Sequence, residues 1–151
     1  MPVQPIPPGY HTITPYLIVS GLPATIAFLE TVFDAKSTAP PMLRPDGTIM
    51  HTELQIGDSR IMMAEATDEW KPMPCANFLY LPDCDSSFKR AIAAGATSLM
   101  EPADQFYGDR MGGVADQTGN QWWIATHVED VAPEEMDRRR SDYLASLTAP
   151  V

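Results

Sequence analysis

Cysteine, long apolar runs and basic residues are all scarce in this chain of 151 residues. Its two cysteines, Cys75 and Cys84, are too few and too irregularly spaced for a disulfide framework or a zinc site. No apolar run approaches the roughly 18–20 residues that cross a bilayer, and the first residues lack the basic and apolar regions of a signal peptide. We therefore expect a cytoplasmic protein without a membrane partner.

The scarcity of basic residues leaves the chain strongly acidic. Ten Lys and Arg residues stand against twenty Asp and Glu residues, a formal charge of −10 at pH 7. Such a surface repels nucleic-acid phosphates and anionic lipid headgroups, so we expect neither as a partner. The glycines do not follow a nucleotide-binding pattern, and no serine lies in a G-x-S-x-G elbow. With 44% hydrophobic residues, the chain has enough apolar material for one domain with a sizeable core.

The first half of the chain predicts a strand, a helix, a ragged edge and a hairpin. Four prolines among residues 1–9 indicate an extended arm. Apolar residues then recur every three or four positions, which is typical of a helix with one buried face. Gly57-Asp58 predicts a hairpin turn between two alternating segments. In order, the segments are a strand at Tyr10–Val19, a helix carrying Leu22, Ile26, Leu29 and Phe33, a loop or ragged edge strand at Ala39–Gly47, and hairpin strands at Met50–Ile56 and Arg60–Ala66.

The second half repeats this order. Gly57 and Gly119 precede similar strands about 62 residues apart, which indicates an internal repeat. The segments are a strand at Asn77–Leu81, a helix from Asp83 or Asp85 to Ala94 with Phe88, Ala91 and Ile92 on its apolar face, a short strand at Thr97–Met100, a glycine-rich region, and a strand at Gln121–Thr126. We expect one domain at 10–130, made of two βαβββ modules at about 10–68 and 75–130. A C-terminal helix with Pro133 in its first turn, and a tail, occupy 131–151.

Four stretches of sequence in this order carry a resemblance. They are Ile13–Val19 (ITPYLIV), Ile56–Ala66 (IGDSRIMMAEA), Ala91–Leu99 (AIAAGATSL) and Phe106–His127 (FYGDRMGGVADQTGNQWWIATH). Together they resemble the vicinal oxygen chelate superfamily, also called the glyoxalase/bleomycin resistance/extradiol dioxygenase superfamily, and within it the PhnB-like branch. The resemblance implies an α+β fold in which two βαβββ modules form a curled mixed sheet around a half-open ligand cup, commonly in a homodimer.

Metal-dependent members of that superfamily place one ligand on the first and one on the last strand of each module. The matching positions here are Thr14, Met63 (or Met62), Asn77 and Trp123. Hydroxyl, thioether, amide and indole groups are poor ligands for Zn²⁺ and similar ions, which prefer imidazole and carboxylate. The resemblance therefore implies a member without a metal cofactor. In the alternative, a divalent metal binds at shifted ligands, for which His51, Glu53 and Glu65 are the candidates.

The residues that replace these ligands suit an apolar or aromatic molecule. Neighbouring residues on a strand point to opposite faces, so one residue of each of the pairs Trp122/Trp123 and Met62/Met63 faces the cup that the resemblance implies. Indole rings stack on flat ligands, and thioethers adapt to their shape. The same residues also suit a core, and the register stays open. The further ligand-binding candidates are Tyr16 and Tyr80 as hydroxyl donors, with Phe106 and Tyr107 as a rim.

Three residues are candidates for catalysis. His51 and Glu53 lie two positions apart on one strand and share a face, where they form either a base with its orienting carboxylate or a polar surface toward solvent or a dimer partner. Arg110 either binds a carboxylate or enolate-like oxygen of a ligand or forms an ion pair with Asp109 or Asp116.

Three hypotheses for the function follow. In the first, the protein is a metal-free, glyoxalase-like binder of a small apolar or aromatic molecule, and the resemblance to bleomycin resistance proteins implies sequestration of a toxic compound. In the second, it is a lyase, isomerase or dioxygenase, either metal-dependent or metal-independent. In the third, it is a non-catalytic, homodimeric interaction module whose cup is filled by its own side chains.

Overall fold

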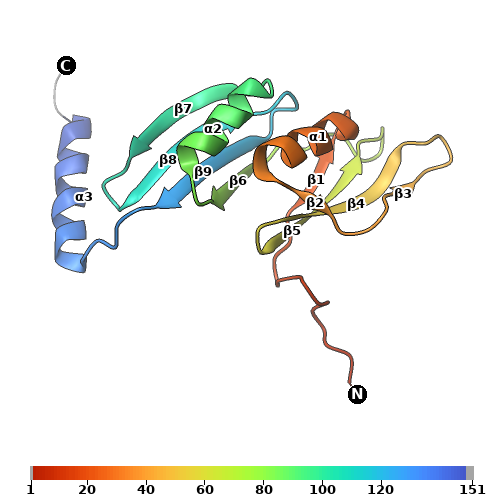
Figure 1. Ribbon diagram of the computed structural model, residues 1–151, viewed down its shortest axis with the longest axis horizontal. Coiled ribbons are helices and arrows are strands. Elements are labelled where there is room, and N and C mark those ends of the chain that lie inside the picture. Colours follow the sequence, from red (N-terminus) through yellow and green to blue (C-terminus); the bar gives the residue numbers. More distant parts are fainter. Residues whose placement is uncertain (1, 149–151) are drawn as a thin grey trace.

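The computed structural model describes residues 2–148, which form an α+β fold of nine strands and three helices in two modules (Figure 1). The first module contains β1 (Tyr16–Val19), α1 (Leu22–Phe33), β2 (Lys36–Ser37), β3 (Met42–Leu43), β4 (Ile49–Ile56) and β5 (Ser59–Glu65). The second contains β6 (Ala76–Tyr80), α2 (Cys84–Ala93), β7 (Thr97–Asp104), β8 (Asp109–Ala115) and β9 (Gln121–His127). Helix α3 (Pro133–Thr148) follows the second module.

The two modules share one strand order. The first sheet runs β1-β5-β4-β2, with β3 also paired to β4, and the second runs β6-β9-β8-β7. In each sheet the first strand lies parallel to the last strand of its module, while the other pairs are antiparallel. The predicted doubled βαβββ order is therefore confirmed, with a separate mixed sheet for each module.

One apolar core joins the modules. Helices α1 and α2 lie on the same side of the molecule, each over its own sheet (Figure 1). Leu29 of α1 and Phe88 of α2 belong to the same buried cluster, and the Phe33 and Trp122 rings, one from each module, lie 5.6 Å apart. Strand residues alternate between this core and the opposite face of each sheet, which neither α1 nor α2 covers. We call this uncovered face the open face of each module.

The first strand is shorter than predicted. The segment Tyr10–Val19 was expected to be a strand throughout, but β1 begins only at Tyr16. Pro15, which has no N–H to donate, precedes it, and its carbonyl accepts the first cross-strand hydrogen bond, from the Met62 N–H at 2.9 Å. The structure also places Lys36–Ser37 and Met42–Leu43 as two short edge strands, so the Pro-rich segment between them is a ragged edge, as expected.

The second module holds one strand whose bounds the sequence did not give. The glycine-rich region before Gln121 contains β8, a full seven-residue strand. A Cβ added at Gly113 would lie 2.4 Å from the Trp123 ring, so glycine is needed there for this ring to lie over β8. The apolar face predicted for α2 is also corrected at one residue, because Ile92 is 39% exposed.

Helix α3 stands at the far end of the second module (Figure 1). It attaches through Tyr143, whose ring lies 5.0 Å from that of Phe106, and through the Arg139–Glu129 ion pair at 2.8 Å. Met1 of the predicted arm and residues 149–151 of the predicted tail lie outside the described residues. Between residues 2 and 148, no helix combines the length and the apolar character that a membrane crossing requires.

Candidate functional site

A pocket of about 740 Å³ opens beside β1 on the first module. Most of the side chains around it are aromatic or aliphatic, with charged groups in the minority. The lining residues are Tyr16, Ile18, Arg44, Met50, Ala64, Thr67, Asp68, Glu69 and Trp70. This composition is typical of a site for a small, partly apolar molecule.

The strand register brings β1 and β5 side chains to this pocket. Tyr16 pairs with Met62, and Ile18 pairs with Ala64, so these four residues share the open face of the first module. Met63 points the other way and is fully buried in the core. Met62 is therefore on the open face, and Met63 does not line a cup.

Arg44 lines the pocket from the turn after β3. Its guanidinium donates to the Thr48 hydroxyl at 3.2 Å, to the Ile49 carbonyl at 3.4 Å and to the Glu65 carbonyl at 3.2 Å. These bonds hold the turn between β3 and β4 against the end of β5. Arg44, Ile18 and Trp70 were not among the predicted site residues. Trp70 lies between Asp68-Glu69 and Lys71, and a lone tryptophan in such a charged segment is the sequence signal that would have singled it out; the structure leaves it 61% exposed.

A chain of three polar side chains leads away from Tyr16. The Tyr16 hydroxyl is 3.2 Å from Nδ1 of His51, and Nε2 of His51 is 3.1 Å from a carboxylate oxygen of Glu53. The Thr38 hydroxyl donates to the other carboxylate oxygen at 3.4 Å. His51 and Glu53 therefore share a face, as expected, and also contact each other directly. Tyr16 connects these two side chains to the pocket.

The surroundings of Glu53 favour its ionised form. The neighbouring Tyr10 hydroxyl and the His51 imidazole hold the pKa of the Glu53 carboxyl below its ordinary value, against a smaller opposing effect of burial. The Tyr10 hydroxyl itself is buried. The Arg60 guanidinium lies over the Tyr10 ring at 4.9 Å from its centre. Glu53 is thus a carboxylate that accepts hydrogen bonds at neutral pH.

The open face of the second module is more aromatic. Phe78 pairs with Trp123, and Tyr80 follows on the same face. Trp122 points into the core, where its Nε1 donates to Asp116 at 2.9 Å, and it is only 1% exposed. Of the two tryptophans, Trp123 is therefore on an open face and Trp122 is not. Asn77 also points away from the open face and donates to the Cys75 sulfur at 3.4 Å.

A second polar cluster lies on this face, and sequence reasoning missed it. Asp109 is only 3% exposed and accepts hydrogen bonds from the Tyr80 hydroxyl at 3.0 Å and from Nδ1 of His127 at 2.7 Å. Nε2 of His127 contacts Asp130 at 2.8 Å. The carboxylates of Asp109 and Asp130 raise the pKa of His127, and Asp109 raises the pKa of Tyr80. Asp109 lies opposite His127 because β8 and β9 pair in this register, which the sequence did not give.

Arg110 lies on the helix side of its sheet. It forms a two-bonded ion pair with Asp85 of α2, at 2.6 and 2.9 Å, and a further contact to Asp104 at 3.2 Å. These carboxylates raise the pKa of its guanidinium. The ion-pair interpretation was right in kind but wrong in its partners, because Asp109 is the neighbouring residue on the strand and points to the other face. Arg110 does not reach either open face.

The predicted rim residues pack under α3. Phe106 lies between the rings of Tyr107 and Tyr143, with centres 5.3 and 5.0 Å away. Burial raises the pKa of the Tyr107 hydroxyl, whose contact is the Met111 sulfur at 3.6 Å. Phe106 and Tyr107 therefore anchor α3 beside the second open face.

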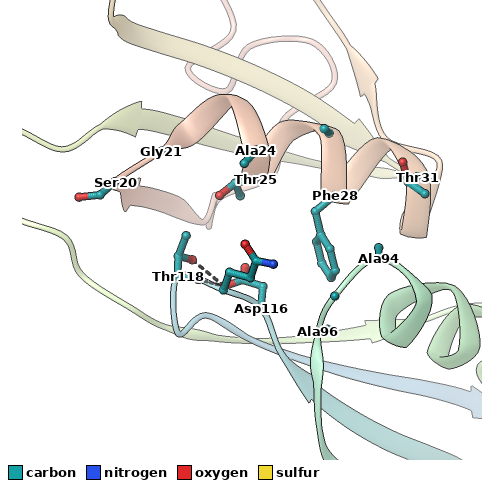
Figure 2. A pocket seen from close by; sticks show the side chains of 13 residues that line it. Ser20, Gly21, Ala24, Thr25, Phe28, Thr31, Ala94, Ala96, Asp116 and Thr118 are labelled. Atoms are coloured by element: carbon teal, nitrogen blue, oxygen red, sulfur yellow. Dashed lines mark hydrogen bonds between the residues drawn. The ribbon is translucent and has the colours of Figure 1, made fainter.

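A further pocket, of about 510 Å³, lies between α1 and the turn that joins β8 to β9 (Figure 2). Phe28 points into it from α1 (Figure 2). The Asp116 carboxylate on its wall already accepts hydrogen bonds from the Thr118 hydroxyl at 2.6 Å and from the Thr118 N–H at 2.8 Å. Because the carboxylate is already hydrogen-bonded within the turn, this pocket is a weaker candidate for a ligand site than the one beside β1.

The residues present do not fit a metal ion of the kind that the superfamily uses. Thr14 lies before β1, Met63 and Asn77 point away from the open faces, and Trp123 offers an indole, which is not a ligand. Within residues 2–148, no group of three or more His, Cys, Asp or Glu side chains is arranged to hold a metal.

The set of shifted ligands does not assemble either. The Glu65 carboxylate accepts hydrogen bonds from the backbone N–H groups of Gly21 and Leu22, both at 2.7 Å, at the start of α1. Glu65 therefore points to the helix side of the sheet, whereas His51 and Glu53 point to the open face. The hypothesis that these three side chains hold one metal is wrong.

Comparisons with known proteins agree with this architecture. The family model described as "Glyoxalase/Bleomycin resistance protein/Dioxygenase superfamily" matches residues 9–124. An uncharacterized protein of Mycobacterium bovis is 31% identical over 140 residues, which cover 85% of this chain and 91% of the relative. The crystal structure of TioX from Micromonospora sp. ML1 superposes with a TM-score of 0.66 at 22% identity, covering 78% of this chain and 99% of the other. A PhnB protein from Bacillus cereus, titled a putative 3-demethylubiquinone-9 3-methyltransferase, gives a TM-score of 0.57 at 14% identity, with coverages of 77% and 99%.

Proposed function

The chain belongs to the glyoxalase/bleomycin resistance protein/dioxygenase superfamily, the vicinal oxygen chelate superfamily, and we propose that it binds a small apolar or aromatic molecule without a resident metal. The observation that carries this proposal is the pocket of about 740 Å³ beside β1, with Tyr16, Ile18, Met50 and Trp70 on its walls. A pocket of this size suits a compound of one to a few rings. The hypothesis of an interaction module with a filled cup is less well supported, because this pocket is open.

The proposal includes a homodimer. Large apolar side chains are exposed on both open faces, among them Tyr16 and Phe78 at 48% each and Tyr80 at 65%. A sheet face of this kind is costly to leave in water, and a second copy of the chain offers a complementary apolar face. In the cytoplasm, where we place the protein, such a dimer would shield the pocket from solvent.

Sequestration of a toxic compound is the physiological role that we propose. It is supported by the resistance proteins in the family description and by a pocket whose walls contact a ligand through dispersion and stacking. Binding alone, without turnover, is enough to lower the free concentration of such a compound.

Calorimetric titration with naphthalene and 2-naphthol tests the binding site. We expect Trp70→Ala to weaken binding about tenfold, because the loss of a stacked ring costs about 0.5–1.5 kcal/mol beyond its buried area. Leu147→Ala on α3, which removes a side chain of similar exposure far from the pocket, is the control. Equal affinities for the wild type and Trp70→Ala would place the ligand elsewhere.

Elemental analysis and light scattering test the other two parts. We expect no stoichiometric metal after incubation with Zn²⁺, Mn²⁺, Ni²⁺ or Fe²⁺, since no suitable ligand set is arranged within the described residues. Light scattering should give twice the chain mass of 16.6 kDa. A tightly held metal, or a monomer at micromolar concentration, would contradict the corresponding part of the proposal.

A further inference from the structure

We propose that Tyr16, His51 and Glu53 form a proton relay that ionises a phenol or enol bound in the pocket beside β1. This inference rests on the proposed function in one respect, since it needs a ligand in the same pocket. It goes further by assigning to that pocket a proton-transfer activity and a class of substrate, an aromatic compound with an acidic hydroxyl group.

The hydrogen bonds fix the direction of the relay. The ionised Glu53 carboxylate can only accept, so the proton of the neutral His51 ring lies on Nε2, 3.1 Å away. Nδ1 of His51 then carries a lone pair and accepts the hydrogen bond of the Tyr16 hydroxyl at 3.2 Å. In this order of hydroxyl, imidazole and carboxylate, the imidazole is the base that accepts the hydroxyl proton, and the carboxylate orients the imidazole.

The relay runs from the pocket at β1 across the open face to β4. Tyr16 lines the pocket and is 48% exposed, whereas the side chains of His51 and Glu53 are 33% and 25% exposed. The Thr38 hydroxyl holds the second oxygen of Glu53 at 3.4 Å. Tyr16 is therefore the residue that touches a ligand, and His51 and Glu53 are positioning residues behind it.

Other ionisable groups lie at the two ends of the relay, and those at the Tyr16 end are Arg44, Asp68 and Glu69, which line the pocket. On β3, the residue opposite His51 is Met42, which carries no charge. On the Glu53 side, the Tyr10 hydroxyl is the neighbour, with the Arg60 guanidinium beyond it against the Tyr10 ring. The carboxylate of Glu53 is thus the charge closest to the imidazole, and it favours the imidazolium that the relay produces.

The proposed step balances without an added reagent. The ligand O–H bond breaks and its proton passes to the Tyr16 oxygen, while the original Tyr16 proton passes to Nδ1 of His51. The products are a ligand anion, an unchanged Tyr16 hydroxyl and an imidazolium paired with the Glu53 carboxylate. The reverse transfer restores the neutral ring, so the relay can also return a proton to a different atom of an enolate.

The second polar cluster lacks this order of groups. There the Asp109 carboxylate lies between the Tyr80 hydroxyl and His127, and both nitrogens of His127 contact carboxylates. The Tyr80 proton therefore has no lone pair of an imidazole to move to. Tyr80 is also a hydrogen-bonded tyrosine, but it lies on the other open face. It is therefore a matched control for Tyr16.

4-Nitrophenol is the probe for the test, because its absorbance reports its ionisation. Equilibrium dialysis measures whether it binds, and the absorbance of the bound dye is then followed against pH. We expect the bound dye to ionise about one pH unit below the free dye, a tenfold shift in the equilibrium. Tyr16→Phe should bind the dye and lose the shift, Glu53→Gln should reduce it, and Tyr80→Phe should keep it.

The outcomes separate the two proposals. A dye that binds but ionises at the same pH as in solution, or a shift that persists in Tyr16→Phe, overturns the relay and leaves the binding site standing. Binding of naphthalene without binding of 4-nitrophenol overturns the assigned substrate class. If neither compound binds, the proposed function fails together with the relay that depends on it.

Discussion

The two modules share one strand order but differ at the edge strand of the sheet. In the first module the edge is split into two pairs of residues, β2 and β3, with Pro40 and Pro41 between them. In the second module β7 is one strand of eight residues. Proline cannot donate a ladder hydrogen bond, so it interrupts the first edge. Arg44, which follows β3 at this broken edge, is one of the residues that line the pocket beside β1.

The two module helices also begin differently. The N-terminus of α2 is capped by its own Asp83, which accepts from the Ser86 N–H at 3.0 Å. The N-terminus of α1 follows Gly21, which has a positive φ of 77° and no side chain, and it is capped instead by Glu65 from β5. The same need for acceptors at a helix start is met locally in one module and across the fold in the other.

The largest effect that we expect separates the two neighbouring tryptophans. Trp122→Ala should lower the free energy of unfolding by about 3–5 kcal/mol, because it empties a large core site and leaves Asp116 without the Nε1 donor. Trp123→Ala removes a side chain from the open face and should cost about 1 kcal/mol. Urea unfolding of both variants measures the difference. Similar losses would mean that the core and open faces of β9 are assigned incorrectly.

A smaller effect distinguishes the two helix caps. Glu65→Ala should cost about 2 kcal/mol, since it removes a charged acceptor from two backbone N–H groups near the positive end of α1. Asp83→Ala, which removes one acceptor from α2, should cost about 1 kcal/mol. The free energy of unfolding in urea is again the measurement, with Glu65→Gln expected to lie between the wild type and Glu65→Ala. If Asp83→Ala proved the more damaging, the contrast between local and distant capping would be lost.

Local patterns were enough to predict most of the first module. The alternation of Met50–Ile56 and the Gly57-Asp58 turn predicted the β4–β5 hairpin, and the two-residue spacing placed His51 and Glu53 on one face. The contact from Tyr16 to His51 joins residues 35 positions apart. It depends on β5 lying between β1 and β4, which no local pattern encodes. For the same reason the sequence named Tyr16 as a hydroxyl donor but not its partner.

Close approach of the backbone explains what was missed in the second module. Gly112 and Gly113 lower the strand propensity of β8, yet the Trp123 ring occupies the space where a Cβ of Gly113 would lie. Because glycine has no side chain, the alternation of apolar and polar residues that marks a strand is not visible at these two positions. Without the bounds and register of β8, the pairing of Asp109 with His127 was missed, and so was the ion pair of Arg110 with Asp85 of α2.

The two polar clusters should respond to pH in opposite directions. The lowered pKa of Glu53 means that its contribution to stability is present above the ordinary value of 4.5 and is lost as the pH falls through the lowered pKa. The raised pKa of His127 means that its contribution is complete below the ordinary value of 6.5 and is lost as the pH rises through the raised pKa.

Proton NMR of the histidine rings tests this contrast at the level of single groups. His127 should titrate above 6.5, because the carboxylates of Asp109 and Asp130 favour its imidazolium. Asp130→Asn removes the exposed one of these charges and should move the midpoint down, while Asp109 still holds Nδ1. A His127 that titrates at or below 6.5 would show that the cluster is open to water, and the second module would then hold a free imidazole on its open face.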